Sequence, residues 1–318
     1  MSDQASAFAH RPVLLPLVVE LFAPVPPGVL VDATVGGGGH AAALLDAYPH
    51  LSILGLDQDP DAAAAARSRL RGFGARATVR QTRFDDLAAT LHEVGHDRAS
   101  GALFDLGVSS PQLDRPERGF SYRADGPLDM RMDSTQAETA ADLVNGSDVG
   151  ELARILRTYG DERYARRIAH AIVAARPIGG TAQLAEVVRY AIPAPARRRG
   201  GHPARRTFQA LRIAVNDELA ILAPALDQAI EALAPGGRCV AVAYHSGEDR
   251  IVKARFRHAA TGGWSGPADL PPPPDVRPTV RLVRRGAWKP SPEETSTNPR
   301  AESARARAVE KLPLQEVA

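Results

Sequence analysis

The sequence has little cysteine, few aromatic residues and almost no net charge. Cys239 is the one cysteine among 318 residues, which excludes an internal disulfide and any zinc site built from cysteines. Because Cys239 lies inside an apolar run, we expect it to be a small buried hydrophobe. The formal net charge is +2, so any surface that attracts nucleic acid must be a local one.

Long apolar segments are also missing. No stretch suits a membrane span, and the N-terminal residues lack the apolar core of a signal peptide. We therefore expect a soluble, cytoplasmic protein with no membrane partner. The length suits about two domains of ~150 residues each, and a hydrophobic content of 44% supports buried cores. The oligomeric state stays open, and a homodimer is compatible with the sequence.

The stretch from residue 29 to residue 59 predicts a strand, a glycine turn, a helix and a second strand. Its two apolar runs end in Asp32 and Asp57, and the glycines 36–39 follow the first run. This is the opening βαβ unit of a doubly wound sheet. Glycine suits a turn that needs left-handed backbone angles and brings a ligand close to the main chain. The acid after the second strand is expected to accept hydrogen bonds from ribose hydroxyls.

The glycine turn does not identify the cofactor by itself. Residues 36–41 match G-x-G-x-x-A, so a dinucleotide stays open, as does an ordinary turn whose acids cap helices. Two acids favour S-adenosylmethionine. Asp32 stands just before the turn, where it repels a pyrophosphate but suits the ammonium of a methionine moiety. Asp105 ends a further apolar run, where its carboxylate suits the sulfonium side of the cofactor or the amine that is methylated.

Alternating strand and helix patterns surround a segment that has helix patterns only. We expect further strands over residues 77–80, 101–108, 238–244, 279–284 and 304–309, with a polar loop over 291–300. The helix patterns without strands lie over residues 141–144, 149–158, 162–175 and 182–191. The sequence thus predicts a discontinuous α/β domain over 1–112 and 205–318, and a mainly helical insertion over 113–204. Substrate recognition by this insertion is an expectation that comes with the family resemblance described below.

One long amphipathic helix is predicted after the insertion. Apolar residues recur at three- and four-residue steps from Phe208 to Leu233, with Thr207 as the N-cap. Gln209, Arg212 and Asn216 form a polar stripe on the opposite side. This stripe faces either a cleft or solvent.

The carboxyl ends of the strands are the expected place for the site, because open α/β sheets bind ligands there. Phe84 follows the third predicted strand, where its ring is suited either to packing on an adenine ring or to packing in the hydrophobic core. Ser109 and Ser110 follow the fourth strand and begin a polar turn. His245 follows the fifth strand, where it acts as a proton acceptor, as an RNA contact or as the cap of the next helix.

An arginine-rich loop joins the insertion to the long helix. Such a loop neutralises phosphates and makes affinity fall with salt, although a solvated basic loop is the alternative. The expected RNA-binding residues are Arg197, Arg198, Arg199, Arg205, Arg206 and, on the helix, Arg212.

Nearly the full chain resembles one known family, the small-subunit ribosomal RNA methyltransferase H family, also called MraW. The resemblance rests on several separate stretches, which include the glycine turn and the segment DLGVSSPQLD. They are residues 10–13, 32–40, 105–114, 126–133, 159–162, 206–219, 245–250 and 298–300. Departures are small: the family's glycine turn more often begins with a bulkier residue, and its last strand is usually less rich in alanine.

The resemblance implies a class I methyltransferase fold and methylation of the N4 amine of one cytidine near the decoding centre of 16S ribosomal RNA. It also implies S-adenosylmethionine contacts at Gly38, Gly39, His40, Asp57, Phe84, Asp105 and Gln112. The residues themselves indicate Asp57 and Asp105, but not Gln112. We expect Asp105 and His245 to be the catalytic residues and expect no metal.

Two other function classes stay open. One is a methyltransferase for a protein or a small metabolite, and the basic loop and the insertion argue against a metabolite. The other is a ribosome-assembly factor that binds the cofactor as a signal without turnover.

Overall fold

The structure is a computed structural model that describes residues 12–197, 201–266, 273 and 276–313. The chain divides into two compact units. The sheet unit comprises Met1–Gly107 and Leu219–Ala318, and the helical unit comprises Val108–Glu218. His10, Arg11, Arg198 and Arg199, which the sequence analysis singled out, lie outside the described residues.

The sheet unit is built on seven strands in the order β3-β2-β1-β4-β5-β7-β6. All neighbours are parallel except β7, which runs antiparallel to β5 and β6. This arrangement confirms the predicted class I methyltransferase sheet and its closing pair of strands. The strands are β1 Gly28–Asp32, β2 Leu51–Asp57, β3 Ala77–Gln81, β4 Ala99–Asp105, β5 Leu233–Ala243, β6 Val280–Leu282 and β7 Arg305–Lys311.

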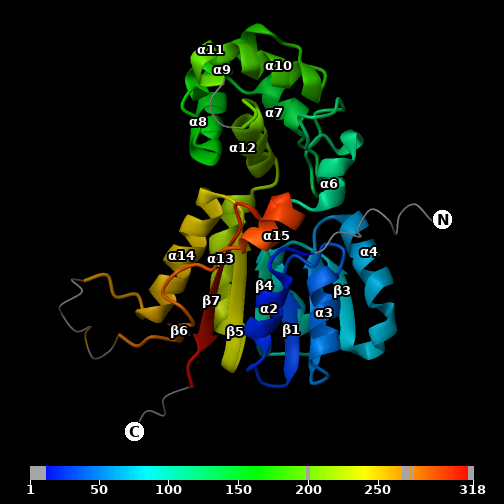
Figure 1. The fold of residues 1–318 in the computed structure, drawn as a ribbon, viewed down its shortest axis with the longest axis vertical. Helices are drawn as coiled ribbons and strands as arrows, with labels where there is room; N and C mark the ends of the chain where they lie inside the picture. The colour runs from blue at the N-terminus through cyan, green and yellow to red at the C-terminus, as the bar shows by residue number, and fades with distance from the viewer. Residues whose placement is uncertain (1–11, 198–200, 267–272, 274–275, 314–318) are drawn as a thin grey trace. The chain divides into compact units, whose positions relative to one another are not determined.

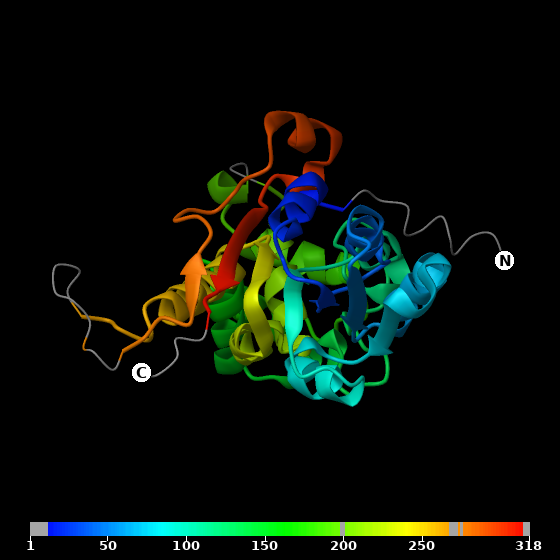
Figure 2. The same ribbon diagram turned by 90° about the horizontal axis from the view of Figure 1, so that it is seen from below.

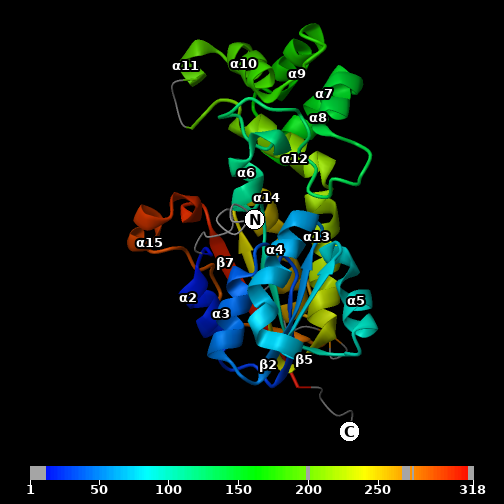
Figure 3. The same cartoon turned by 90° about the vertical axis from the view of Figure 1, so that its right-hand side faces the viewer.

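Helices cover both faces of this sheet (Figure 2 and Figure 3). Leu30 and Ile53 pack into one buried cluster, whereas their neighbours Val31 and Leu54 pack into the other. This alternation follows because successive side chains of a strand point to opposite faces. One face is covered by α2 Leu15–Phe22, α3 Gly39–Ala47 and α4 Pro60–Leu70, and the other by α5 Leu87–Glu93, α13 Glu218–Ala232 and α14 Ser246–Ala260.

The helical unit forms its own core, with Leu156, Ile168, Leu184 and Phe208 fully or almost fully buried. The four helix patterns of the predicted insertion correspond to α7–α10, and Figure 1 shows these helices in green. The helices are α6 Ser110–Asp114, α7 Ala140–Gly146, α8 Val149–Gly160, α9 Ala165–Ala174, α10 Thr181–Ala191, α11 Ala194–Arg197 and α12 Arg205–Val215.

The predicted long helix is two helices, α12 and α13. Asp217 adopts a left-handed conformation with φ 53°, which ends the regular helix between them. The prediction of Thr207 as N-cap is also wrong, because Thr207 lies inside α12 and is fully buried. Apolar spacing continued through the break, so periodicity did not reveal it. Residues 205–218 belong to the helical unit and not, as predicted, to the sheet domain.

Two predicted loops contain short helices. The polar turn after β4 is α6, and the Gln112 side chain caps its start, since Gln112 Oε1 accepts from the Ser109 backbone N–H. The polar loop over 291–300 contains α15 Pro292–Thr297, where Ser291 accepts a hydrogen bond from the Glu294 backbone N–H. The 3₁₀ turns are Arg71–Arg76, Phe84–Asp86, Pro116–Arg118 and Pro299–Ala301. Among the described residues, every helix is too short or too polar to cross a bilayer.

Candidate active site

Three carboxylates end neighbouring strands of the sheet. Asp32 is the last residue of β1, Asp57 of β2 and Asp105 of β4. Because β1 pairs in parallel with both β2 and β4, the carboxyl ends of all three strands lie at one edge of the sheet. The sequence predicted these three acids at this edge.

The glycine turn lies between β1 and α3, and Asp57 is bonded to it. Gly36 and Gly38 have φ of 51° and 77°, the left-handed region that favours glycine. The backbone N–H of Gly36 donates to Asp57 Oδ2 at 2.9 Å. A Cβ on Gly39 would lie 2.5 Å from Pro12 Cγ. The turn therefore has no room for a side chain at Gly39, and Asp57 helps to hold it in place.

Asp32 at the end of β1 and His40 at the start of α3 are buried ionisable groups that influence each other electrostatically. Burial raises the pKa of Asp32 to about 7, opposed by the charge of His40 and supported by that of Asp105. Burial by itself lowers the pKa of His40, but Asp105 and Asp32 outweigh it, so the net shift is upward. Among the described residues, Nδ1 of His40 has no hydrogen-bond partner, whereas its Nε2 faces the Asp105 carboxylate. The cluster can therefore change its charge near neutral pH.

Asp105 is held by its neighbours in a fixed orientation. Its Oδ1 accepts a hydrogen bond from the Tyr244 hydroxyl at 2.7 Å, and its Oδ2 lies 3.4 Å from His40 Nε2. Burial and the nearby Asp105 raise the pKa of Tyr244 well above its ordinary value, so this phenol stays a donor. Sequence reasoning missed Tyr244. Its position directly after β5, at the same edge as Asp105, was the signal available.

His245 caps α14. Its Nδ1 accepts hydrogen bonds from the backbone N–H groups of Gly247 and Glu248, at 3.2 and 3.4 Å. Glu248 returns the contact, since its Oε2 accepts from the backbone N–H of His245 at 3.2 Å, and also from that of Tyr244 at 2.7 Å. The capping alternative is thus the one that the structure displays. A further role of His245 in proton transfer stays a prediction.

Phe84 and Gln112 also have structural partners. The Phe84 ring meets Phe104 edge to face, with centroids 6.0 Å apart, and packs against the core of the sheet unit. Gln112 is buried in the helical unit, and its Oε1 accepts from the Ser109 backbone N–H at 2.9 Å. Their predicted cofactor contacts, like those of Gly38, Gly39 and His40, stay predictions.

The predicted RNA-binding arginines lie in different surroundings. Arg205 and Arg206 are exposed at the start of α12, and Arg206 donates to the Asp161 carbonyl. Arg197 lies 5.8 Å from the Tyr190 ring centroid. Arg212 is different: it forms a two-pronged ion pair with Glu218, at 2.7 and 2.8 Å, and its side chain is only 12% exposed. Its guanidinium is already engaged within the protein.

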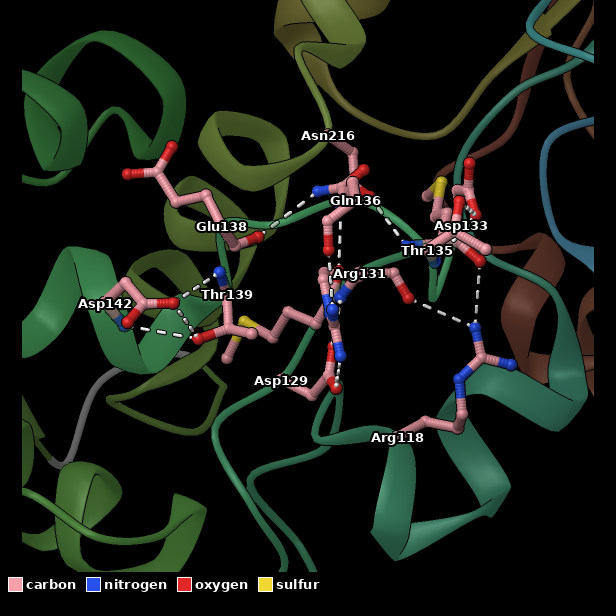
Figure 4. Close-up of polar contacts among 12 residues, drawn as sticks. Arg118, Asp129, Arg131, Asp133, Thr135, Gln136, Glu138, Thr139, Asp142 and Asn216 are labelled. Carbon is pink, nitrogen blue, oxygen red and sulfur yellow. Dashed lines mark hydrogen bonds and ion pairs between the residues drawn. The ribbon is translucent and has the colours of Figure 1, made fainter.

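Asn216 faces neither a cleft nor solvent, so both alternatives for the polar stripe were wrong at this position. It is 2% exposed. Its Oδ1 accepts from the Met132 backbone N–H, and its Nδ2 donates to the carbonyls of Met130 and Arg212. Figure 4 shows Asn216 and Arg118 on either side of the segment that contains Arg131, and Arg118 donates to the carbonyls of Arg131 and Met132. These bonds fix residues 130–132, where Met130 has a φ of 60°.

The comparisons with known proteins cover both units. The model of the MraW methylase family matches residues 7–312. Ribosomal RNA small subunit methyltransferase H of Thermobifida fusca is 54% identical over 310 residues, which cover 95% of this chain and 93% of that protein. The protein of the same name from Acidothermus cellulolyticus is 54% identical over 318 residues, with 98% and 96% covered. This chain therefore belongs to the MraW methylase family.

Proposed function

We propose that this protein transfers a methyl group from S-adenosylmethionine to the N4 amine of a cytidine in 16S ribosomal RNA. The observation that supports it most is the set of three carboxylates and a bare glycine turn at one edge of the sheet, in a chain of this family. The relatives' shared name supports the small-subunit RNA as substrate. The proposal places the reaction in the cytoplasm. It does not depend on whether the chain forms a homodimer.

The residues at this edge fit S-adenosylmethionine. At Gly36 the nearest protein atom lies 3.9 Å from the place of a Cβ, so a ligand can approach the backbone there, and the buried Nδ1 of His40 leaves polar capacity at the start of α3 among the described residues. Asp57 would accept from the ribose hydroxyls, and ionised Asp32 would attract the ammonium. When bound, the cofactor supplies an electrophilic methyl on a positively charged sulfur.

Asp105 is the residue that we assign to the amine. The lone pair of a cytosine N4 is delocalised into the ring, so the amine is a poor nucleophile. An acceptor that holds its N–H bonds directs the lone pair, and such positioning supplies on the order of 7–11 kcal/mol. The amine proton becomes acidic as the new N–C bond forms, so the Asp105 carboxylate can accept it. Tyr244 is a positioning residue, because its hydroxyl holds Oδ1.

The test is methyl transfer from labelled cofactor to small ribosomal subunits that lack the modification, followed by digestion to nucleosides. The expected product is labelled N4-methylcytidine, and subunits that already carry the modification serve as the control. Free 16S ribosomal RNA in a parallel reaction distinguishes naked RNA from the assembled particle as the substrate. Label in a protein or a small molecule, or tight cofactor binding without transfer on either RNA substrate, would overturn the proposal.

A further inference from the structure

The outer faces of α8 and α9 carry exposed arginines that have no acidic partner. Arg157 of α8, Arg163 just before α9, and Arg166 and Arg167 of α9 are all exposed. Among the described residues, no carboxylate forms an ion pair with any of the four. Four unpaired guanidinium groups on neighbouring helices create a local positive field that the small net charge of the chain conceals.

The acids of the same helices are occupied elsewhere. Glu151 pairs with Arg154 at 2.6 Å, and Glu186 pairs with Arg189 at 2.7 Å. Glu162 is buried and accepts from the Tyr164 backbone N–H. Exposed Asp161, the C-cap of α8, offsets part of the positive charge of the four arginines, which still outnumber it.

Two hollows flank α9. One, of about 460 Å³, lies between α8 and α9, and Arg157, Arg166 and His170 are among the residues that line it. The other, of about 530 Å³, lies between α9 and α10, and Arg167, Tyr190 and the Arg189-paired Glu186 are among the residues that line it. Helix α9 is thus a ridge with cations on both sides. Hollows of this size take a small ligand or one unit of a chain.

Tyr190 provides an exposed aromatic ring at the second hollow. It is 61% exposed, the largest exposure of any large hydrophobic residue in the described part of the chain. The Arg189 guanidinium lies 4.4 Å from the ring centroid, and Arg197 from the predicted RNA-binding set lies 5.8 Å from it. Aromatic rings and arginine planes are the groups on which proteins stack unpaired bases.

We propose that α8, α9 and α10 form a binding surface for an unpaired stretch of the RNA substrate. Phosphates lie along the arginines of α8 and α9, and a base stacks at Tyr190. The pairing of cations with a stacking ring favours single-stranded RNA, because a membrane surface would call for a broader apolar face. This inference rests on the proposed function and extends the RNA surface beyond the arginine-rich loop.

The first experiment measures RNA affinity against salt for the triple variant Arg157→Ser, Arg166→Ser and Arg167→Ser. Its slope of log affinity against log salt should be shallower than wild type by about 2, at ~0.7 per single-strand phosphate contact. The matched control is Arg67→Ser, Arg71→Ser and Arg80→Ser, which removes the same charge from exposed positions of the sheet unit. Cofactor affinity, measured by calorimetry, should be unchanged in both triple variants.

The second experiment separates stacking from charge. Tyr190→Ala should weaken binding to the 16S ribosomal RNA by roughly five- to hundredfold, the range found for loss of one stacked base. Tyr190→Phe keeps the ring and should restore affinity to within about twofold. Vesicles of phosphatidylglycerol and phosphatidylcholine test the other anionic surface, and wild type should not bind them.

The outcomes separate this inference from the proposed function. If wild type fails to methylate RNA, the proposed function is wrong. If wild type methylates RNA and both triple variants weaken binding equally, or neither does, the surface proposed here is wrong. It is equally wrong if the α8–α9 variant loses vesicle binding but keeps RNA affinity, or if Tyr190→Ala binds like wild type.

Discussion

The two units position their polar side chains in different ways. In the sheet unit, the polar residues of the candidate site stand at strand ends, where a parallel hydrogen-bond ladder fixes their positions. In the helical unit, polar side chains hold together irregular segments that are far apart in the sequence, as Asn216 does with residues 130–132. Local sequence pattern therefore predicts the positions of residues that a regular sheet aligns. It does not predict the positions of residues that are held by single tertiary hydrogen bonds.

The largest expected effect concerns the candidate site of the sheet unit. Asp105→Asn should lower the single-turnover rate of methyl transfer by about 10²–10⁴-fold, because a positioned proton acceptor is lost. RNA affinity should be retained. Asp97→Asn, at an 89% exposed side chain, is the matched control. A rate within threefold of wild type would exclude Asp105 as the acceptor.

Tyr244→Phe separates positioning from proton transfer. It removes the hydroxyl that donates to Asp105 but leaves the carboxylate. We expect kcat to fall about fivefold or more with a nearly unchanged KM for RNA, in line with the loss of about 1 kcal/mol from one hydrogen bond. A change confined to KM would contradict the positioning role.

The next prediction disturbs the helical unit alone. Asn216→Ala should lower its free energy of unfolding by about 2–4 kcal/mol, because buried backbone groups of Met130 and Met132 lose their partners. Hydrogen exchange should show faster exchange in the helical unit and unchanged exchange in β1, β2 and β4. Asn216→Asp retains the acceptor and should be less damaging than the alanine variant. Uniform destabilisation of both units would mean that they do not behave as separate bodies.

Asp57→Ala probes the glycine turn. We expect cofactor affinity to fall by about 1–3 kcal/mol, since the ribose hydroxyls and the Gly36 N–H would lose an acceptor. Isothermal calorimetry measures the change, with exposed Asp46→Ala as the control. An unchanged affinity would remove Asp57 from the cofactor site.

The last prediction is a pH dependence. The pKa of folded Asp32 is about 7 against an ordinary 3.8, so the folded state binds more protons between these values, and this group's contribution to stability falls as pH rises from 4 to 7. Its ionisation should strengthen cofactor binding by at most tenfold per pH unit, about 1.4 kcal/mol, as pH passes through 7. Asp32→Asn should remove the Asp32-dependent part of both trends. If the pH profiles of stability and of cofactor affinity for Asp32→Asn match those of wild type, Asp32 does not titrate near pH 7.

Much of the sheet unit was predictable from the sequence. Asp32, Asp57 and Asp105 each follow a short apolar run, and parallel strands bring such residues to one edge. Tyr244 was missed because its role depends on the order of β4 and β5 in space, which no local pattern gives. In the helical unit, α7–α10 were predictable from periodicity. The end of α12 was not predictable, because the Asn216 side-chain amide forms hydrogen bonds with Met130 and Met132, about 85 positions earlier in the sequence.

The arginines illustrate the same limit. A run of cations marks a basic surface, but the sequence cannot say which guanidinium is already paired. Arg212 was grouped with the RNA-binding residues and is held by Glu218. Arg157, Arg166 and Arg167, scattered along two helices, were overlooked although they are exposed and form no ion pair within the described part of the chain.

The order of strands has a consequence for synthesis on the ribosome. β4 must pair with β5, yet the whole helical unit is translated between them. At about 5–20 residues per second, the nascent chain spends seconds with an open β4 edge, a site at which strands of other chains can add. β7, which lies between β5 and β6, emerges last of all. The edge of the sheet that carries the candidate site is thus completed only after the helical unit has had time to fold.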